Sequence, residues 1–149
     1  MRRPPLLALV FVLAPLAIAL LALTAPRRAA AETRRLAIVV GNNAGGPADK
    51  PLRYAEEDAT KVADVLSQLG GVHPGGLFLL RGQGRSELAD VLRRVTQRVT
   101  DDRQNPADRS VLLFYFSGHS DGEALEFGGD RVPFDELRRW LAGTRADVR

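Results

Sequence analysis

The fold is decided by the segment from Val111 to Gly122, which reads VLLFYFSGHSDG. Its first six residues are apolar, rich in β-branched and aromatic types, and the run stops abruptly at small residues. This pattern is typical of a strand that is buried on both faces, and such strands occur in parallel sheets that helices cover. Because ligands of open α/β sheets bind at the carboxyl ends of the strands, His119 is predicted to lie at a binding edge.

His119 is therefore the first candidate for a catalytic residue. Its neighbours Gly118, Ser120 and Gly122 are small, so they leave the imidazole accessible and allow a substrate to approach the backbone. A histidine at this place can also be a structural residue that merely hydrogen-bonds a loop carbonyl. The local sequence favours catalysis by His119 without deciding it.

Residues 1–31 are predicted to be a secretory signal peptide. Arg2 and Arg3 form a positively charged start, residues 6–24 are an apolar run, and residues 29–31 supply a small-residue cleavage site. The protein is therefore expected to be exported, either to the periplasm or as a secreted protein. An uncleaved membrane anchor is the alternative, because the apolar run is long enough to span a bilayer core of roughly 30 Å. Pro15 within the run favours cleavage.

Charge and cysteine content exclude several classes of function. All four ionisable residues of segment 1–31 are arginines, so 17 of the 21 basic residues and all 18 acidic residues remain after cleavage. This balance of charges gives no reason to expect a nucleic-acid partner. If the N-terminal segment is cleaved, the remaining protein is not expected to be stably inserted in a membrane. The sequence contains no cysteine, which rules out a thiol nucleophile, a zinc–thiolate site or a disulfide within these 149 residues.

The order of predicted elements is that of a three-layer α/β domain with a mostly parallel sheet. Three apolar strands alternate with two amphipathic helices, and a hairpin, a third helix and the start of a further strand follow. The strands are expected at 36–40, 77–80 and 111–116, the helices from Tyr54, Ser86 and Pro133, the hairpin at 124–132, and the last strand from 147. The loop at 44–51 follows a parallel strand, so it is expected at the same sheet edge as His119.

Other chemistries fit this sequence poorly. Ser117, His119 and Asp121 cannot form a catalytic triad, because residues two apart in a tight loop do not make a linear array of nucleophile, base and orienting acid. A metal site of His119, Asp121 and Glu123 is conceivable, but one histidine and two loop carboxylates give it little support from the sequence. The early strands are not followed by a phosphate-binding glycine motif. We therefore predict no metal and no other cofactor.

Three motifs follow one another along the chain: LAIVVGNN at 36–43, Leu52-x-x-Ala55-x-x-Asp58-Ala59, and LFYFSGH at 113–119. Each motif alone is only moderately specific, whereas the three in this order are specific together. Residues 35–149 thereby resemble the caspase-like cysteine peptidases, in particular the bacterial caspase and metacaspase-like members. The resemblance implies that 32–149 is a caspase-like peptidase domain with a three-layer α/β fold and a protein or peptide substrate. Dependence on calcium stays open.

The resemblance also implies roles for two neighbouring residues. His119 would be the catalytic histidine of a Cys-His dyad, which polarises the thiol and later protonates the leaving amine. The backbone N–H of Ser120 would help to form the oxyanion hole together with the N–H of the cysteine. Many relatives have glycine where this chain has Ser120, a change that a backbone donor tolerates if the φ angle of the residue stays negative.

A third role implied by the resemblance concerns substrate specificity. In metacaspase-like relatives, an acid at the place matched by Asp58 lines the pocket for the residue before the scissile bond, which predicts cleavage after Arg or Lys. Caspases proper instead use an arginine near this region to hold aspartate, and Arg53 is close by. The sequence also offers a purely structural explanation of Asp58, since an acid is stabilised in the first turn of a helix.

The nucleophile is the main departure from the family pattern. In relatives it follows the next strand, in a motif like Asp-Ala-Cys-x-Ser-Gly, and here that strand is only beginning at Val148. A strand of about 5–6 residues would place the cysteine a few positions beyond Arg149, so the domain is expected to be C-terminally incomplete. Two interpretations remain: a fragment of a working cysteine endopeptidase, or a shortened, inactive relative that binds peptides.

Overall fold

A computed structural model describes residues 31–101, 103 and 106–149 of the chain. The signal peptide predicted at 1–31 lies outside these residues, apart from its last position. Among the described helices, none is both long and apolar enough to cross a membrane. Residues Ala31–Arg149 form one compact unit, and its mixture of helices and strands confirms the predicted α/β class.

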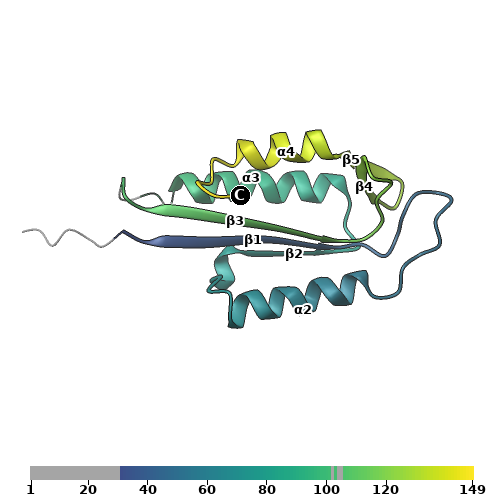
Figure 1. Cartoon of the computed structure of the whole chain (residues 1–149), viewed down its shortest axis with the longest axis horizontal. Helices are drawn as coiled ribbons and strands as arrows, with labels where there is room; N and C mark the ends of the chain where they lie inside the picture. Colours follow the sequence, from purple (N-terminus) through teal and green to yellow (C-terminus); the bar gives the residue numbers. More distant parts are fainter. Residues whose placement is uncertain (1–30, 102, 104–105) are drawn as a thin grey trace, which may run out of the picture. The chain divides into compact units, whose positions relative to one another are not determined.

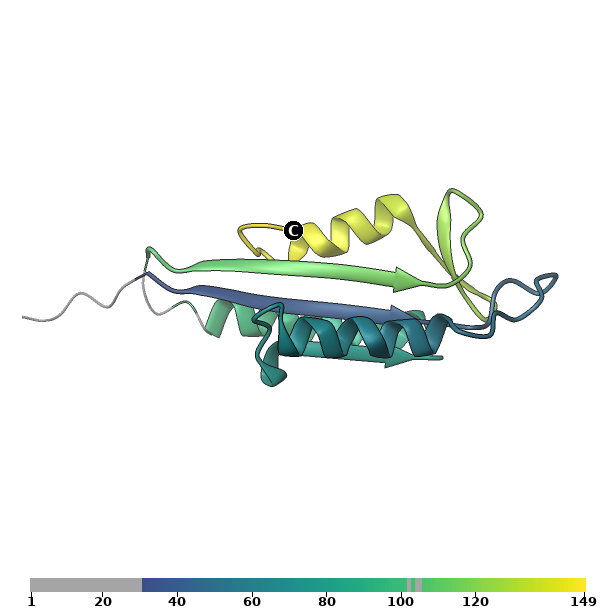
Figure 2. The same ribbon diagram turned by 60° about the horizontal axis from the view of Figure 1, so that its bottom comes forward.

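The main sheet has three parallel strands, β1 (Thr33–Gly41), β2 (Leu77–Arg81) and β3 (Arg109–Ser117), in the order β2-β1-β3. Figures 1 and 2 show these strands side by side with their carboxyl ends at the same end of the sheet. A separate antiparallel hairpin of β4 (Ala124–Phe127) and β5 (Asp130–Pro133) follows β3. Both the parallel sheet and the hairpin are as the sequence predicts.

Helices cover the two faces of the sheet and complete the three layers. Helix α2 (Ala55–Gln68) lies on one face, and helices α3 (Arg85–Asp101) and α4 (Phe134–Gly143) lie on the other (Figure 1). The short 3₁₀ helix η1 (Pro74–Gly76) leads into β2. The five apolar residues that repeat at helical spacing along α3 are all buried, as expected from its amphipathic pattern: Leu88, Val91, Leu92, Val95 and Val99.

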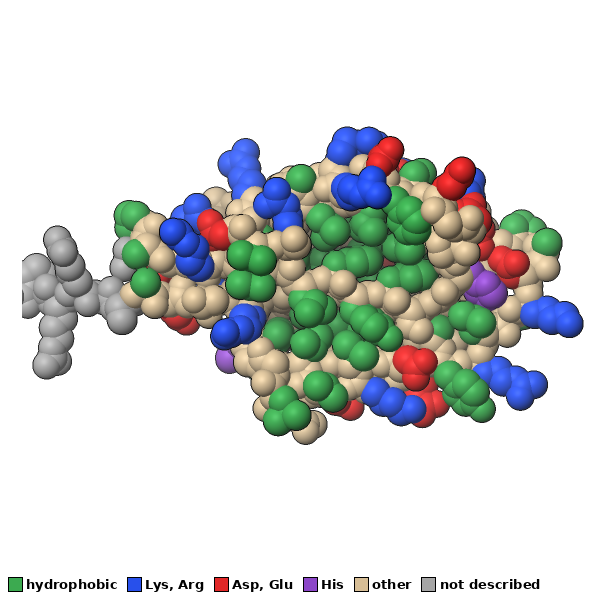
Figure 3. Space-filling model, viewed as in Figure 1, with side chains coloured by type: hydrophobic (Ala, Val, Ile, Leu, Met, Phe, Trp, Pro, Cys, Tyr) green, Lys and Arg blue, Asp and Glu red, His purple; other side chains and the backbone are tan. Residues whose placement is uncertain are grey.

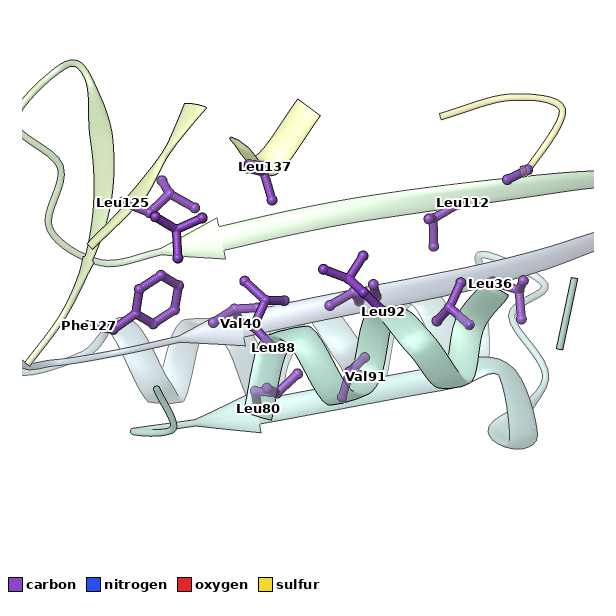
Figure 4. Close-up of a cluster of buried hydrophobic side chains, with 14 of the residues drawn as sticks. Leu36, Val40, Leu80, Leu88, Val91, Leu92, Leu112, Leu125, Phe127 and Leu137 are labelled. Atoms are coloured by element: carbon purple, nitrogen blue, oxygen red, sulfur yellow. The ribbon is translucent and has the colours of Figure 1, made fainter. Parts of the chain in front are cut away.

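Strand β1 is the centre of the core, because alternate side chains of a strand point to opposite faces of the sheet. Ile38 and Val40 pack in the cluster that contains α3, whereas Ala37 and Val39 pack in the cluster that contains α2. Figure 4 shows the first cluster, in which side chains from β1, β2, β3, α3, α4 and the hairpin meet. All of Leu36–Val40 is at most 5% exposed, as predicted for a strand buried on both faces.

The burial predicted for β3 is wrong. Leu112 is 3% exposed, but Leu113 is 40% exposed, because β3 lies at the edge of the sheet. Within the described part of the chain, β3 pairs with β1 on one side, and on the other side with Val148 through a single bridge to Val111. That bridge is parallel, as expected for the start of a further parallel strand. Figure 3, which has the same view as Figure 1, shows hydrophobic side chains gathered over the middle of this side of the molecule.

The burial predicted for the end of α2 is also wrong at one residue. The apolar residues that recur at helical spacing from Ala55 onward predict Leu69 on the buried face, but it is 84% exposed. The helix ends at Gln68, so Leu69 follows its last turn instead of continuing the apolar stripe. The residues of α2 that reach full burial are small, namely Ala55, Ala59 and Ala63, and they allow the helix to pack closely on the sheet.

Candidate active site

The carboxyl ends of the three parallel strands are joined by one buried residue, Asn42, which is 3% exposed. Its backbone N–H donates to the carbonyl of Ser117 at the end of β3 (3.0 Å). Its Nδ2 donates to the carbonyl of Gln83 after β2 (3.2 Å), and its Oδ1 accepts from the N–H of Ala44 (2.8 Å). Asn42 therefore fixes the three loops relative to one another.

The loop that carries His119 is held on both sides. On the N-terminal side, a side chain at Gly118 would place its Cβ 2.5 Å from the ring of Phe116, so only glycine fits this close turn. On the C-terminal side, the N–H of Glu126 donates to the carbonyl of His119 (3.0 Å), and Ser120 forms an antiparallel bridge with Leu125. The hairpin thus fixes the backbone of the histidine.

The imidazole of His119 lies against the loop that follows β1. Its Nδ1 is 3.7 Å from Oδ2 of Asp49, and the side chain is only 18% exposed. Gly45 lies beneath the ring, where an added Cβ would be 2.6 Å from both the imidazole Cγ and Oδ2 of Asp49. Nε2 is buried without a hydrogen-bond partner among the described residues. Neither ring nitrogen therefore has a hydrogen-bond partner among the described residues.

Two acidic side chains, Asp49 and Glu126, adjoin the histidine. Both accept from the same N–H, that of Gly46, at 2.8 Å for Oδ2 of Asp49 and 3.2 Å for Oε2 of Glu126. The pKa of Asp49 is lowered, first by this backbone hydrogen bond, then by a hydrogen bond with Glu126, and to a smaller extent by the charge of His119. One ligand atom from each of Asp49, His119 and Glu126 lies within 4.8 Å of the other two.

Ser120, the predicted oxyanion residue, directly follows the histidine and is exposed. Its hydroxyl donates to the carbonyl of Ala124 (2.8 Å) and accepts from the N–H of Gly122 (3.2 Å). Among the described non-glycine residues, Arg145 is the one with a positive φ. The φ of Ser120 therefore has the negative sign that its proposed role as a backbone donor requires.

Asp58, the predicted specificity residue, lies at the beginning of α2 and is half-buried. Figure 2 shows that α2 begins at the end of the sheet where β1 and β3 finish. Both Asp58 and His119 lie toward this end of the sheet, and no ion pair joins them among the described residues. The charge of Asp58 also acts on Lys61, whose pKa is raised mainly by its hydrogen bond to Glu57 and less by Asp58.

The other carboxylates of the histidine loop have structural roles. Asp121 accepts from the N–H groups of Glu123 (2.9 Å) and Ala124 (2.8 Å) and pairs with Arg131, and these contacts lower its pKa in that order. Asp121 is thus engaged in shaping the turn. Asp121 and Glu123, which the sequence analysis considered as metal ligands without predicting a metal, are not part of the cluster around His119, whose two acids are Asp49 and Glu126.

Sequence reasoning missed Asp49 and Glu126 as individual site residues, although signals for both were present. The loop at 44–51 was expected at the edge of His119, and it contains a single acid, Asp49. Glu126 lies on the first strand of a hairpin that was predicted to follow the histidine directly. His73, the second histidine, is an exposed loop residue, and its Nδ1 accepts from the N–H of Gly75 (3.1 Å).

The fold and the site define a three-layer α/β protein with a partly exposed histidine at the carboxyl edge of its parallel sheet. The family model for the caspase domain of peptidase family C14 matches residues 34–147, which is most of the chain, and the protein belongs to this family. Searches of curated proteins and of solved structures found no match. Family membership supports a cysteine-peptidase-like function and a protein substrate.

Proposed function

We propose that the chain supplies the histidine-bearing part of a cysteine-type endopeptidase, with His119 as its catalytic histidine. The observation that carries the proposal is the imidazole at the sheet edge, enclosed to 18% exposure with no hydrogen bond at either nitrogen among the described residues. Such a ring can accept the proton of a thiol to give a thiolate and later donate that proton to the leaving amine. Residues 1–31 would direct the export of the enzyme.

The thiol would come from a cysteine outside these 149 residues, which contain none. The bridge between Val111 and Val148 supports this part of the proposal. Leu112 donates its N–H to the carbonyl of Val148 (2.8 Å), and Val148 donates to the carbonyl of Ser110 (3.1 Å). Since the bridge is parallel, a strand that continued past Val148 would run along β3 toward the edge where His119 lies.

The oxyanion of the tetrahedral intermediate would be stabilised by the backbone N–H of Ser120 and by that of the cysteine. Backbone donors at such a place act strongly because they are already oriented where the negative charge develops. The negative φ of Ser120 and the pairing of its loop with the hairpin support this role. Serine in place of glycine is accommodated because the donor belongs to the main chain.

Cleavage after Arg or Lys would depend on Asp58. Its half-buried position in the first turn of α2, at the end of the sheet where the histidine lies, supports an acid that faces a bound cationic side chain. The carboxylates of Asp49 and Glu126 add negative charge at the same edge. A basic substrate residue would therefore approach through a favourable potential.

The experiment for His119 uses the full protease that contains this chain and its thiol. His119→Ala should lower turnover of an Arg-containing peptide by at least about 10²-fold, because the general base and acid are lost. His73→Ala is the matched control and should leave turnover unchanged. Undiminished hydrolysis by His119→Ala would contradict the proposal.

For specificity, Asp58→Asn should lower kcat/KM for Arg and Lys peptides, whereas Asp64→Asn, on the exposed part of the same helix, should not.

A second function, in which the domain binds basic peptides without cleaving them, is favoured by the missing cysteine. In that case the 149-residue chain itself should bind a fluorescent Arg-containing peptide, and Asp58→Asn should weaken this binding. Equal affinity of wild type and Asp58→Asn would argue against the binding function. Turnover by the longer protein would separate the two functions, since only the peptidase produces cleaved peptide.

A further inference from the structure

We propose that Asp49, His119 and Glu126 form a binding site for a zinc ion. One ligand atom of each side chain, a carboxylate oxygen or a ring nitrogen of the histidine, lies within 4.8 Å of the other two, and Nδ1 of His119 is 3.7 Å from Oδ2 of Asp49. Zinc binds imidazole nitrogen and carboxylate oxygen at about 2.0–2.2 Å, and open zinc sites commonly have three protein ligands and a water.

The backbone holds the three ligands in place before any ion arrives. Glu126 donates its N–H to the carbonyl of His119 (3.0 Å), so these two ligands belong to one paired segment. Asp49 is held by the N–H of Gly46, which Glu126 also contacts. Gly45 lets the loop pack directly against the imidazole, since a Cβ there would be 2.6 Å from the ring. The ligands are thus oriented by the fold, which favours metal binding.

Charge at the cluster also favours a cation. Two carboxylates meet at a single neutral donor, the N–H of Gly46. In the described part of the chain, no arginine or lysine forms an ion pair with Asp49 or Glu126, and the one cationic group beside them is the imidazole of His119 when protonated. Two acids this close to each other repel unless a proton or a cation lies between them, and a bound cation can take the place of the proton in the hydrogen bond between Asp49 and Glu126.

The ligand set favours zinc over calcium or magnesium. Calcium and magnesium bind oxygen ligands almost exclusively, whereas imidazole nitrogen suits zinc and other transition metals. The site is accessible to an ion, since Asp49 is exposed and the two other ligands are half-buried. A bound zinc ion would occupy one ring nitrogen of His119 and keep that nitrogen from exchanging a proton. This inhibitory effect rests on the proposed function, whereas zinc binding itself does not.

The test is a zinc titration of the full chain, prepared without a polyhistidine tag, in competition with a chromogenic chelator. We expect one zinc ion per chain, no binding by His119→Ala, and affinity lowered at least about tenfold in Asp49→Asn and Glu126→Gln, which keep side-chain size but weaken the ligand. His73→Ala and Glu123→Gln are the matched controls and should bind like the wild type. Wild-type affinity in His119→Ala or Glu126→Gln would overturn the proposal, as would displacement of zinc by equimolar calcium.

A second measurement separates loss of the site from loss of the fold. Zinc should raise the unfolding temperature of the wild type, because a ligand that binds only the folded state stabilises it. Glu126→Gln should unfold at the wild-type temperature without zinc and gain nothing from its addition. An equal rise in both proteins would overturn the assignment of Glu126 as a ligand. Neither measurement requires a thiol. A failure to bind zinc would therefore leave the proposed peptidase function untouched, and a failure of the peptidase function would leave the zinc site untouched.

Discussion

The carboxylate of Asp49 lies 3.7 Å from Nδ1 of His119, although the two residues belong to loops that follow different strands. The parallel arrangement explains this contact, because the carboxyl ends of β1 and β3 lie side by side in the sheet. The two loops meet so closely that the residue between them is Gly45, with no side chain. The site is therefore a product of the sheet topology and of local packing at one position.

The first prediction concerns that close packing. Gly45→Ala would place a Cβ 2.6 Å from the imidazole and from Oδ2 of Asp49, so the loop and the ring must move apart. We expect the free energy of unfolding to fall by about 1–3 kcal/mol, as is usual for overpacking. Chemical denaturation of the full chain measures this loss, and in a complete protease the same change should lower kcat.

Gly143→Ala is the matched control for Gly45. Gly143 is the last residue of α4, and no atom lies within 4 Å of the place where its Cβ would be. Alanine there should leave the stability unchanged or raise it by up to about 1 kcal/mol, since alanine loses less backbone entropy in a helix than glycine does. If Gly45→Ala were as stable as Gly143→Ala, the close approach of the two loops would be contradicted.

The second prediction concerns Asn42. In Asn42→Ala, the carbonyl of Gln83 and the N–H of Ala44 lose their partner in a buried environment. An unsatisfied buried group costs about 1–3 kcal/mol, so the midpoint of denaturation should shift by a corresponding amount. Gln83→Ala is the control, because only the backbone carbonyl of Gln83 takes part in the bond. Equal losses in the two variants would show that the Asn42 side chain is not the link.

Periodicity and the order of elements were enough to predict the sheet, its helices and the position of His119. The burial of Ile38 and Val39 on opposite faces follows from the strand assignment alone, because successive side chains of a strand point to opposite faces of the sheet. The partners of the histidine were not predictable in the same way. Asp49 and Glu126 come from separate elements, and their convergence on the N–H of Gly46 depends on tertiary packing that no local pattern encodes.

Burial was predicted well where an element has neighbours on both sides and badly elsewhere. The pattern of β3 is that of a strand covered on both faces, yet its exposure depends on which strand pairs with its second edge. The apolar spacing of α2 continues to Leu69, yet the helix ends one residue earlier. In both cases the sequence pattern correctly identifies apolar residues, but it does not show whether another part of the fold covers them.

The third prediction tests these assignments with two leucines. Leu88 in α3 is fully buried in the core shown in Figure 4, whereas Leu69 after α2 is 84% exposed. Leu88→Ala should lower the free energy of unfolding by about 2–5 kcal/mol, because it removes apolar contacts and leaves a cavity. Leu69→Ala should change it by less than about 0.5 kcal/mol. A large loss in Leu69→Ala would show that the apolar face of α2 extends beyond Gln68.

The fourth prediction is a dependence of stability on pH that arises at Asp147. Oδ2 of Asp147 accepts from the N–H and the hydroxyl of Ser110, both at 2.8 Å, and its carboxylate pairs with Arg103 (2.9 Å). These contacts, the bonds to Ser110 first, lower the pKa of Asp147 from 3.8 to about 2. Because the folded state binds the proton less tightly than the unfolded state, the carboxylate stabilises the fold above pH 3.8.

This contribution should be lost as the pH falls from about 4 to about 2, where Asp147 becomes protonated in the folded state as well. The difference in unfolding free energy between the wild type and Asp147→Asn should therefore be largest near neutral pH and shrink below pH 4. Urea denaturation at a series of pH values measures it. Asp135→Asn is the control, since Asp135 is exposed and pairs only with its helix neighbour Arg138 among the described residues. A difference for Asp147→Asn that stayed constant down to pH 2 would contradict the anchoring of residues 147–149 to the start of β3.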